Sequence, residues 1–283
     1  MREPRRRVPV YTDLPGYRAA VASLAVSTVP ADAAAGAIVV LSGQDDWWDG
    51  VLAAQADGAA AVVVAAPLAA PSDAVQGLLD AAAVPVLLER PRLRPDVVQQ
   101  LVDAMADAPP GLVTVECSAV ASEAAEVVHD ALGWARAIGR ERLAPQSAST
   151  TPHGSIGLLR ASHADRPLDI TLLVHVVTSG RPGGFLRLTC LGEVLATVTV
   201  DVPAGVASLD VATEKGTLRL PTCFEATERL TLRRALQALD DGQRPADLAG
   251  LLDDSQLSTW FLPWGLERPV QGKRQRVIDT FFG

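Results

Sequence analysis

Two segments decide the fold: Ala61–Pro67 (AVVVAAP) and Val84–Pro91 (VPVLLERP), which flank a helical segment at Ser72–Ala82. Each contains a nearly continuous apolar, β-branched run, as is typical of strands that helices cover on both faces. Strand, helix and strand at this spacing form a right-handed βαβ unit, and successive units build an open parallel sheet. The stretch therefore predicts a doubly wound, Rossmann-like α/β domain.

The same alternation extends over residues 1–143. Further strands are expected at Val8–Tyr11, Ala37–Ser42 and Leu112–Cys117. Further helices are expected at Tyr17–Leu24, Asp45–Asp57, Pro95–Ala106 and Ser122–Ile138. Ser72 and Pro95 are residue types typical of helix starts.

A second domain is expected over residues 144–283. Ala144–Pro152 is small, polar and flanked by prolines, which indicates a connector. Beyond it, antiparallel strands are predicted at Ile170–Val177, Gly184–Cys190, Val194–Val202, Ala207–Thr213 and Thr217–Leu220, and helices at Ala226–Leu239 and Ala246–Trp260. The fold class expected is thus α/β followed by an α+β domain with a mostly antiparallel sheet.

Composition excludes several classes of protein. The chain has 283 residues, 48% of them hydrophobic, and a net charge of −8, so it can form a core and is a poor partner for nucleic acid. Its most apolar run, Ala59–Pro71, is shorter than the roughly 20 residues of a membrane span, and the basic N-terminus leads into no apolar signal segment. The three cysteines, Cys117, Cys190 and Cys223, have no metal-ligand spacing, so we expect no metal and a reducing, cytoplasmic location.

Three local patterns resemble the Gfo/Idh/MocA family of nicotinamide-dependent oxidoreductases, which act largely on sugars and polyols. The pair Ala61–Pro67 and Val84–Pro91 is similar to that family's strands ending in Ala-Pro and Glu-Lys-Pro. Ala196–Leu220 resembles its C-terminal hairpin with Gly-Thr-Leu, and Asp241–Pro245 resembles the link between its final helices. The resemblance covers about residues 60–260 and implies an NAD or NADP cofactor.

The sequence departs from the family where the cofactor's pyrophosphate would bind. A dinucleotide fold needs Gly-x-Gly-x-x-Gly after a strand, and the turn at Ser42–Gly50 has Gly43 at the strand end, followed by two aspartates, Asp45 and Asp46. The aspartates are expected to cap the following helix, or alternatively to bind a ribose hydroxyl. Gly43, Asp45, Asp46 and Pro67 are therefore the candidate cofactor-binding residues.

The catalytic positions depart as well. The family's lysine in Glu-Lys-Pro corresponds here to Arg90, and an arginine does not exchange protons near neutral pH, although it can hold an anion. The family's Asp-x-Gly-x-His motif corresponds to a stretch ending at His175, with Thr171 where the aspartate would stand. Arg90 and His175 are the candidate catalytic residues; the alternatives are a surface arginine and a core histidine.

Three hypotheses remain open. The first is a degenerate member of the family that binds no dinucleotide and acts as a small-molecule-binding or partner subunit; on this hypothesis no cofactor is expected. The second is an active NAD(P)-dependent oxidoreductase that uses Arg90 and His175, and the third is an unrelated two-domain regulator. A homo-oligomer or hetero-oligomer through the second sheet is expected, because two of its strands carry apolar residues whose alternate positions remain for a second surface: Phe185, Leu186, Leu188, Val194, Val198 and Val200. Alternatively, the tail at 268–283 covers that surface.

Overall fold

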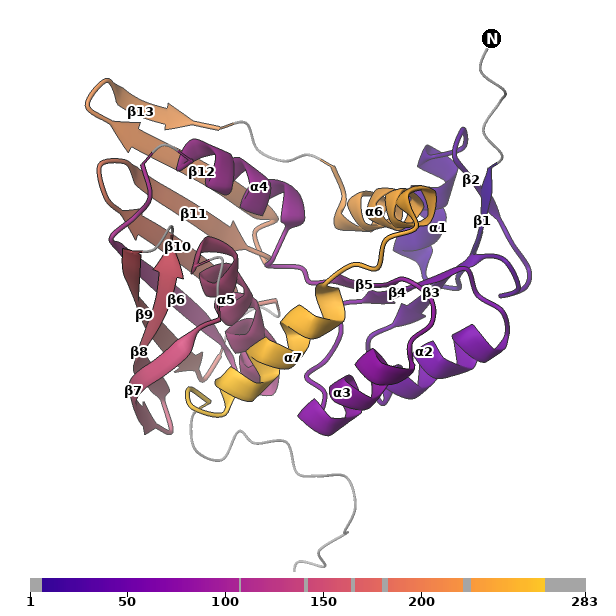
Figure 1. The fold of residues 1–283 in the computed structure, drawn as a ribbon, viewed down its shortest axis with the longest axis horizontal. Helices are drawn as coiled ribbons and strands as arrows, with labels where there is room; N and C mark the ends of the chain where they lie inside the picture. The colour runs from indigo at the N-terminus through magenta and orange to yellow at the C-terminus, as the bar shows by residue number, and fades with distance from the viewer. Residues whose placement is uncertain are drawn as a thin grey trace, which may run out of the picture.

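The protein forms two β-sheets with helices between and around them (Figure 1). The computed structural model describes residues 7–106, 108–139, 142–163, 166–179, 183–220 and 225–262. The expected cover by the tail, at 268–283, and Cys223 both lie outside the described residues. Among the described helices, none combines the length and the apolar character needed to cross a membrane.

The first sheet confirms the doubly wound prediction. Its strands are β1 Val8–Tyr11, β2 Thr28–Pro30, β3 Ile38–Ser42, β4 Ala61–Ala65 and β5 Val86–Glu89. All pairs are parallel, in the order β2-β1-β3-β4-β5. The short strand β2 was not expected. The order 2-1-3-4-5 is that of flavodoxin-like sheets rather than the 3-2-1-4-5-6 order of dinucleotide-binding sheets, and it puts the topological switch point between β1 and β3.

Helices cover both faces of this sheet. They are α1 Pro15–Ser23, α2 Trp47–Ala56, α3 Ser72–Ala81, α6 Thr227–Asp241 and α7 Asp247–Ser258. Alternate residues of β4 enter different cores: Val62 and Val64 pack with α2, α3 and α7, while Ala61 and Val63 pack with α1 and α6. The two C-terminal helices, which follow the second sheet in the chain, therefore lie against the first sheet.

The second sheet has eight strands in the order β13-β12-β11-β10-β6-β9-β8-β7. They are β6 Leu112–Val120, β7 Ala144–Thr151, β8 Gly154–His163, β9 Arg166–Val177, β10 Phe185–Leu191, β11 Leu195–Asp201, β12 Val206–Thr213 and β13 Gly216–Arg219. Only the β6–β9 pair is parallel among those formed, which confirms a mostly antiparallel sheet.

Two sequence-based assignments are wrong. The strand expected at Leu112–Cys117 in the first sheet is β6, which lies inside the second sheet between β9 and β10. Its residues alternate between buried and accessible, as in a sheet with one covered face. The expected connector at Ala144–Pro152 forms the edge strand β7, whose small polar residues suit an exposed edge.

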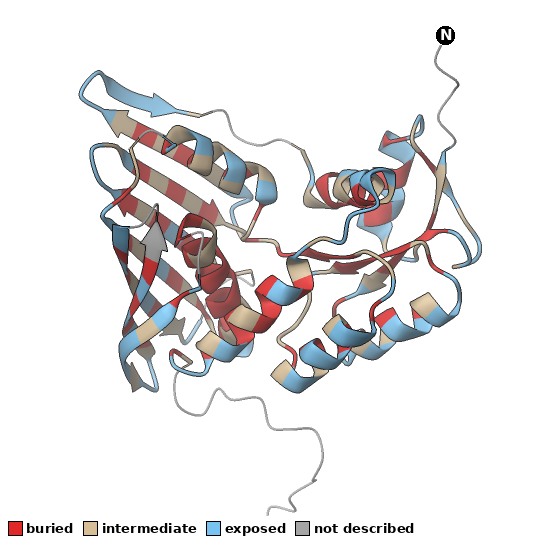
Figure 2. Ribbon diagram, in the orientation of Figure 1, coloured by how far each residue is buried: buried red, intermediate tan, exposed pale blue. Residues whose placement is uncertain are grey.

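Helices cover one face of the second sheet and leave the other open. α5 Ala124–Gly139 contacts β6, β8, β9 and β10, and α4 Pro95–Ala104 contacts β12. Four residues expected on a second surface instead point into this core: Leu186, Leu188, Val198 and Val200. The opposite face is here called the outer face. Along each strand, buried residues that point into the core alternate with more accessible residues that point to the outer face (Figure 2). It includes Ile156, Leu158 and Leu173, which are 50%, 47% and 40% exposed.

Candidate functional site

The carboxyl ends of β3, β4 and β5 form the edge where an open α/β sheet binds ligands. Backbone hydrogen bonds join the first two turns: Gly43 N–H donates to Ala65 O, and Leu68 N–H donates to Gly43 O, both at 2.7 Å. The indole Nε1 of Trp47 donates to Leu68 O at 3.0 Å. A Cβ on Gly43 would lie 2.3 Å from Pro67 Cα, so only glycine fits. Gly43 and Pro67 are thus brought together, in a contact that leaves no space for a ligand between them.

The start of α2 is acidic and exposed. Asp45, Asp46 and Asp49 all lie on the surface within its first turns. Asp46 occupies the N-cap position, but no side chain caps the helix, so the expectation that the aspartates cap it through their carboxylates is wrong. Asp45 adopts a left-handed φ of 50°, which aspartate tolerates better than most residues. Three carboxylates here would repel a pyrophosphate.

The start of α1 lies at the switch point between β1 and β3. Pro15 opens the helix and has no N–H to offer a phosphate. A Cβ on Gly16 would lie 2.6 Å from Glu228 Oε1, so a carboxylate of α6 lies directly over this first turn. A helix N-terminus is a favourable position for an anion, and here the protein's own carboxylate occupies it.

These residues do not fit a dinucleotide. NAD or NADP needs unencumbered backbone N–H groups at a glycine-rich turn before a helix. At α2 the turn is bonded to the β4 loop and flanked by Asp45 and Asp46, and at α1 the position is filled by Glu228. The described residues also contain no group of three or more His, Cys, Asp or Glu that could hold a metal ion.

Glu89, the last residue of β5, is a buried carboxyl group at the same edge. It is only 9% exposed, and Tyr17 Oη donates to its Oε2 at 2.8 Å. Burial raises the pKa of Glu89 by more than the hydrogen bonds from Thr227 and Tyr17 lower it, and the charge of Glu228 raises it further. Burial and the charge of Glu89 raise the pKa of Tyr17 as well.

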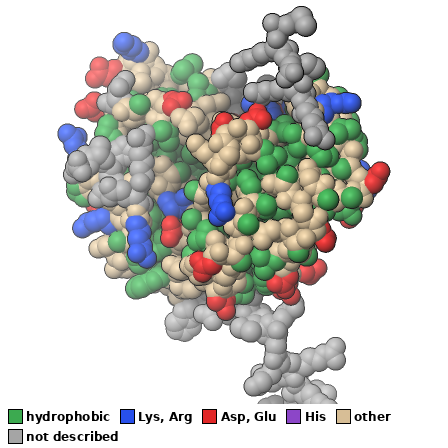
Figure 3. All heavy atoms as spheres, turned by 45° about the vertical axis from the view of Figure 1, so that its right-hand side comes forward, with side chains coloured by type: hydrophobic (Ala, Val, Ile, Leu, Met, Phe, Trp, Pro, Cys, Tyr) green, Lys and Arg blue, Asp and Glu red, His purple; other side chains and the backbone are tan. Residues whose placement is uncertain are grey.

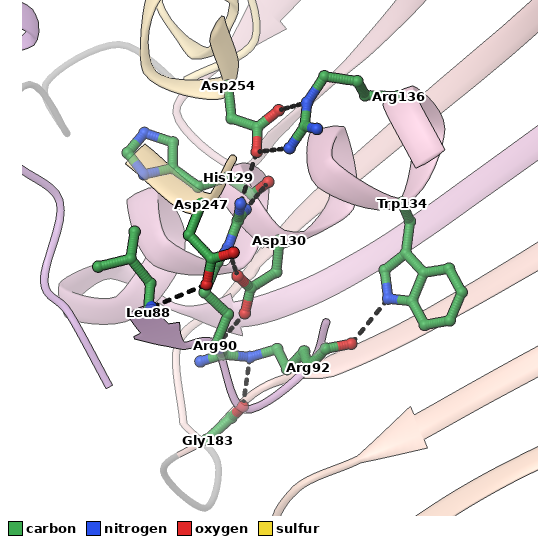
Figure 4. Close-up of polar contacts among 10 residues, drawn as sticks. All are labelled: Leu88, Arg90, Arg92, His129, Asp130, Trp134, Arg136, Gly183, Asp247 and Asp254. Atoms are coloured by element: carbon green, nitrogen blue, oxygen red, sulfur yellow. Dashed lines mark hydrogen bonds and ion pairs between the residues drawn. The ribbon is translucent and has the colours of Figure 1, made fainter. Parts of the chain in front are cut away.

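Arg90 follows Glu89 and is the centre of a buried ionic cluster (Figure 4). Its Nε donates to Asp130 Oδ1 at 2.8 Å, and its Nη1 donates to Asp254 Oδ2 at 2.6 Å. Its Nη2 donates to His129 O at 2.5 Å. Arg90 thus links β5 to α5, which carries His129 and Asp130, and to α7, which carries Asp254.

Two further arginines complete the cluster. Arg92 Nη1 donates to Asp130 Oδ2 at 2.8 Å, and Arg136 contacts Asp254 through Nε and Nη2, both at 3.1 Å. We call Arg90, Arg92, Asp130, Arg136 and Asp254 the buried charge network. Removing one partner from such a network leaves an uncompensated charge in a low-dielectric interior, so the loss of any one member should destabilise the fold.

Arg90 and Asp130 are unsuited to proton transfer near neutral pH. Burial alone would lower the pKa of Arg90, but Asp254 and Asp130 outweigh it and hold the pKa above its ordinary value. Burial alone would raise the pKa of Asp130, but Arg90 and Arg92 lower it below the ordinary value. Because both groups stay charged near neutral pH, neither has the pKa of a general acid or base there.

His175 lies apart from Arg90. It is exposed on the outer face in β9, where it pairs with Ser118 and Gly154. Its neighbour Val174 points to the other side, into the core beneath α5. The second sheet therefore lies between His175 and the buried charge network, and the structure does not bring the two candidate catalytic residues together.

Sequence reasoning missed Asp130, Arg136, Asp254 and Glu228. Two signals were available. Arg90 and Arg92 are alternate residues directly after a buried strand, and Asp130 lies among apolar residues at helical spacing. A charged residue on an apolar helix face needs a buried partner, which the arginines supply.

Comparisons with known proteins support the fold. No protein-family model and no curated protein sequence matches the chain. Among solved structures, it is similar to the UDP-N-acetylglucosamine 3-dehydrogenase GnnA from Acidithiobacillus ferrooxidans, with a TM-score of 0.65, 10% identity and coverage of 90% of this chain and 96% of that one. It is also similar to KijD10, a 3-ketoreductase from Actinomadura kijaniata in complex with TDP-benzene and NADP, with a TM-score of 0.63, 11% identity and the same coverage. These are sugar oxidoreductases of the Gfo/Idh/MocA type, so the resemblance in fold is confirmed.

Proposed function

We propose that this protein keeps the oxidoreductase fold but acts as a binding or partner subunit without dinucleotide-dependent catalysis. One observation carries the proposal: the protein's own groups fill the ligand edge of the first sheet. Pro67 packs on Gly43, and Glu228 lies over the first turn of α1. Arg90, at the position of the family's lysine, is engaged by two carboxylates and a backbone carbonyl.

Thermal unfolding with NAD, NADH, NADP or NADPH tests the proposal. A cofactor with a Kd near 10 μM, present at about 1 mM, would stabilise the folded state by about 2.7 kcal/mol. We expect no rise in the melting temperature with any of the four. A rise of several degrees would contradict the proposal and favour an active NAD(P)-dependent oxidoreductase on a sugar or polyol, the second candidate, which the NADP complex of KijD10 supports.

The partner surface we propose is the outer face of the second sheet. Its exposed side chains Ile156, Leu158 and Leu173 lie on neighbouring strands, and Ile156 pairs directly with Leu173. Apolar patches of this kind are typical of interfaces. Light scattering at micromolar concentration tests self-association: a mass near the 29.7 kDa of one chain would contradict a homo-oligomer.

A further inference from the structure

A hollow lies away from the ligand edge of the first sheet, between the end of α5, α7 and the start of β7. Its volume is about 400 Å³, within the range of small-molecule sites. Leu143, Pro145 and Leu257 supply apolar walls, and Trp260 supplies an aromatic wall that is 52% exposed. A ring-shaped ligand would gain contact with the indole face here.

The buried charge network has one more positive than negative charge, and one of its arginines lines the hollow. That network contains three arginines and two aspartates, and only Arg136 among the arginines reaches the surface, with 28% of its side chain exposed against 8% for Arg90 and 7% for Arg92. Arg136 lines the hollow, and its Nη1 takes no part in the bonds to Asp254. The surplus charge is therefore presented to the hollow.

Arg142 adds a second guanidinium group. It lines the hollow and is exposed to solvent. Among the described residues of the lining, Asp253 on α7 is the only acidic one, so these residues and the network together hold four guanidinium groups against three carboxylates. This balance favours an anion with a single charge, because a dianion would face Asp253.

We propose that this hollow binds a small monocarboxylate that carries an apolar ring. Arg142 and the free edge of Arg136 hold the carboxylate, since planar guanidinium groups match carboxylate geometry. Trp260 packs against the ring. The proposal goes beyond the binding role proposed above. The hollow shares no lining residue with the edge of the first sheet that the cofactor assay probes, so either proposal can fail without the other.

Isothermal titration calorimetry of the full chain with sodium benzoate tests this site. We expect saturable binding with a Kd of about 1 mM or tighter, as is reasonable for a ligand of this size. Benzamide has the same shape without the charge, and acetate has the charge without the ring; both should bind at least about fivefold more weakly. No saturable heat with benzoate, or equal binding of benzamide, would overturn the proposal.

Paired variants identify the residues. Arg142→Gln should weaken benzoate binding at least about fivefold, and Asp253→Asn should tighten it about threefold, because the two charges act in opposite directions. Arg187→Gln removes an exposed arginine on the outer face and should change nothing. Benzoate binding that is unchanged in both Arg142→Gln and Asp253→Asn would place the ligand elsewhere and overturn the proposal.

Discussion

The two sheets differ in what covers their functional surfaces. In the first sheet, the edge where ligands usually bind is filled from within by Pro67, Glu228 and the buried charge network. In the second sheet, one face is covered by α4 and α5, while the outer face carries exposed leucine and isoleucine side chains and half-buried threonines. The comparison teaches that in this fold the ligand edge of one sheet can be filled by packing contacts while the other sheet keeps an open face.

Charge distribution adds to this contrast. On the face of the molecule shown in Figure 3, acidic and basic side chains are interspersed among hydrophobic ones, and no large basic patch forms on its described part. The concentrated charge is internal, where Asp254 is 0% exposed and Asp130 is 3% exposed.

The largest effect is expected for Asp254→Ala. The substitution leaves Arg90 and Arg136 without their shared carboxylate inside the protein, and we expect a loss of about 3–5 kcal/mol in the free energy of unfolding, measured by urea denaturation. Asp169→Ala is the matched control, because the Arg160–Asp169 pair is more than half exposed and should contribute no more than about 1 kcal/mol. Equal losses in the two variants would show that the buried charge network contributes no more to stability than an exposed ion pair does.

A smaller effect is expected for Gly43→Ala. The new methyl group would meet the Pro67 backbone, which cannot move aside cheaply, so a loss of about 1–3 kcal/mol is expected. Gly77→Ala is the control: Gly77 lies within α3 with nothing near its Cβ position, and alanine there should stabilise by up to about 1 kcal/mol. A neutral Gly43→Ala variant would mean that the turn is free to open for a ligand.

Glu89→Gln should change how stability depends on pH. Because the folded protein raises the pKa of Glu89, the neutral carboxyl group favours folding, and its contribution is present below the ordinary value of 4.5 and is lost as pH rises through the raised value. Glutamine keeps an acceptor for Tyr17 without the charge, so the variant should gain stability relative to the natural protein at neutral pH. Urea denaturation at about pH 5 and about pH 8 measures this, and an identical pH dependence in both proteins would contradict it.

The smallest effect on folding is expected at the outer face. Leu173→Thr removes an exposed side chain from a β-strand and should change the free energy of unfolding of the single chain by no more than about 0.5 kcal/mol. If the outer face binds a second copy, the same variant should lower the mass measured by light scattering. A large loss of stability in a monomeric protein would instead place Leu173 in a core contact.

The sequence predicted most of the fold and the location of some candidate residues. Continuous apolar runs such as Ala61–Pro67 identify doubly covered strands, because both faces of such a strand must be apolar. They could not assign β6 to its sheet, since the pattern of a strand does not say which neighbours it pairs with. β7 was missed because its small polar residues resemble a loop when its edge position is unknown.

The candidate site was predictable only in part. Gly43, Pro67 and Arg90 were found because local motifs mark them, whereas their partners come from distant segments: Glu228 lies on α6 and Asp254 on α7. No local pattern states that a carboxylate more than a hundred residues away will neutralise Arg90. His175 was grouped with Arg90 by resemblance, and strand alternation placed it on the opposite side of the second sheet.

By itself, the sequence determined the two kinds of sheet, the absence of a Gly-x-Gly-x-x-Gly turn, and the arginine directly after Glu89, because periodicity and residue identity are local properties. The tertiary structure alone decided which strand joins which sheet, which carboxylates surround Arg90, and that the ligand edge of the first sheet is filled while the outer face stays open. These depend on contacts between residues far apart in the chain, and such contacts are fixed by how surfaces pack together, which no single segment encodes.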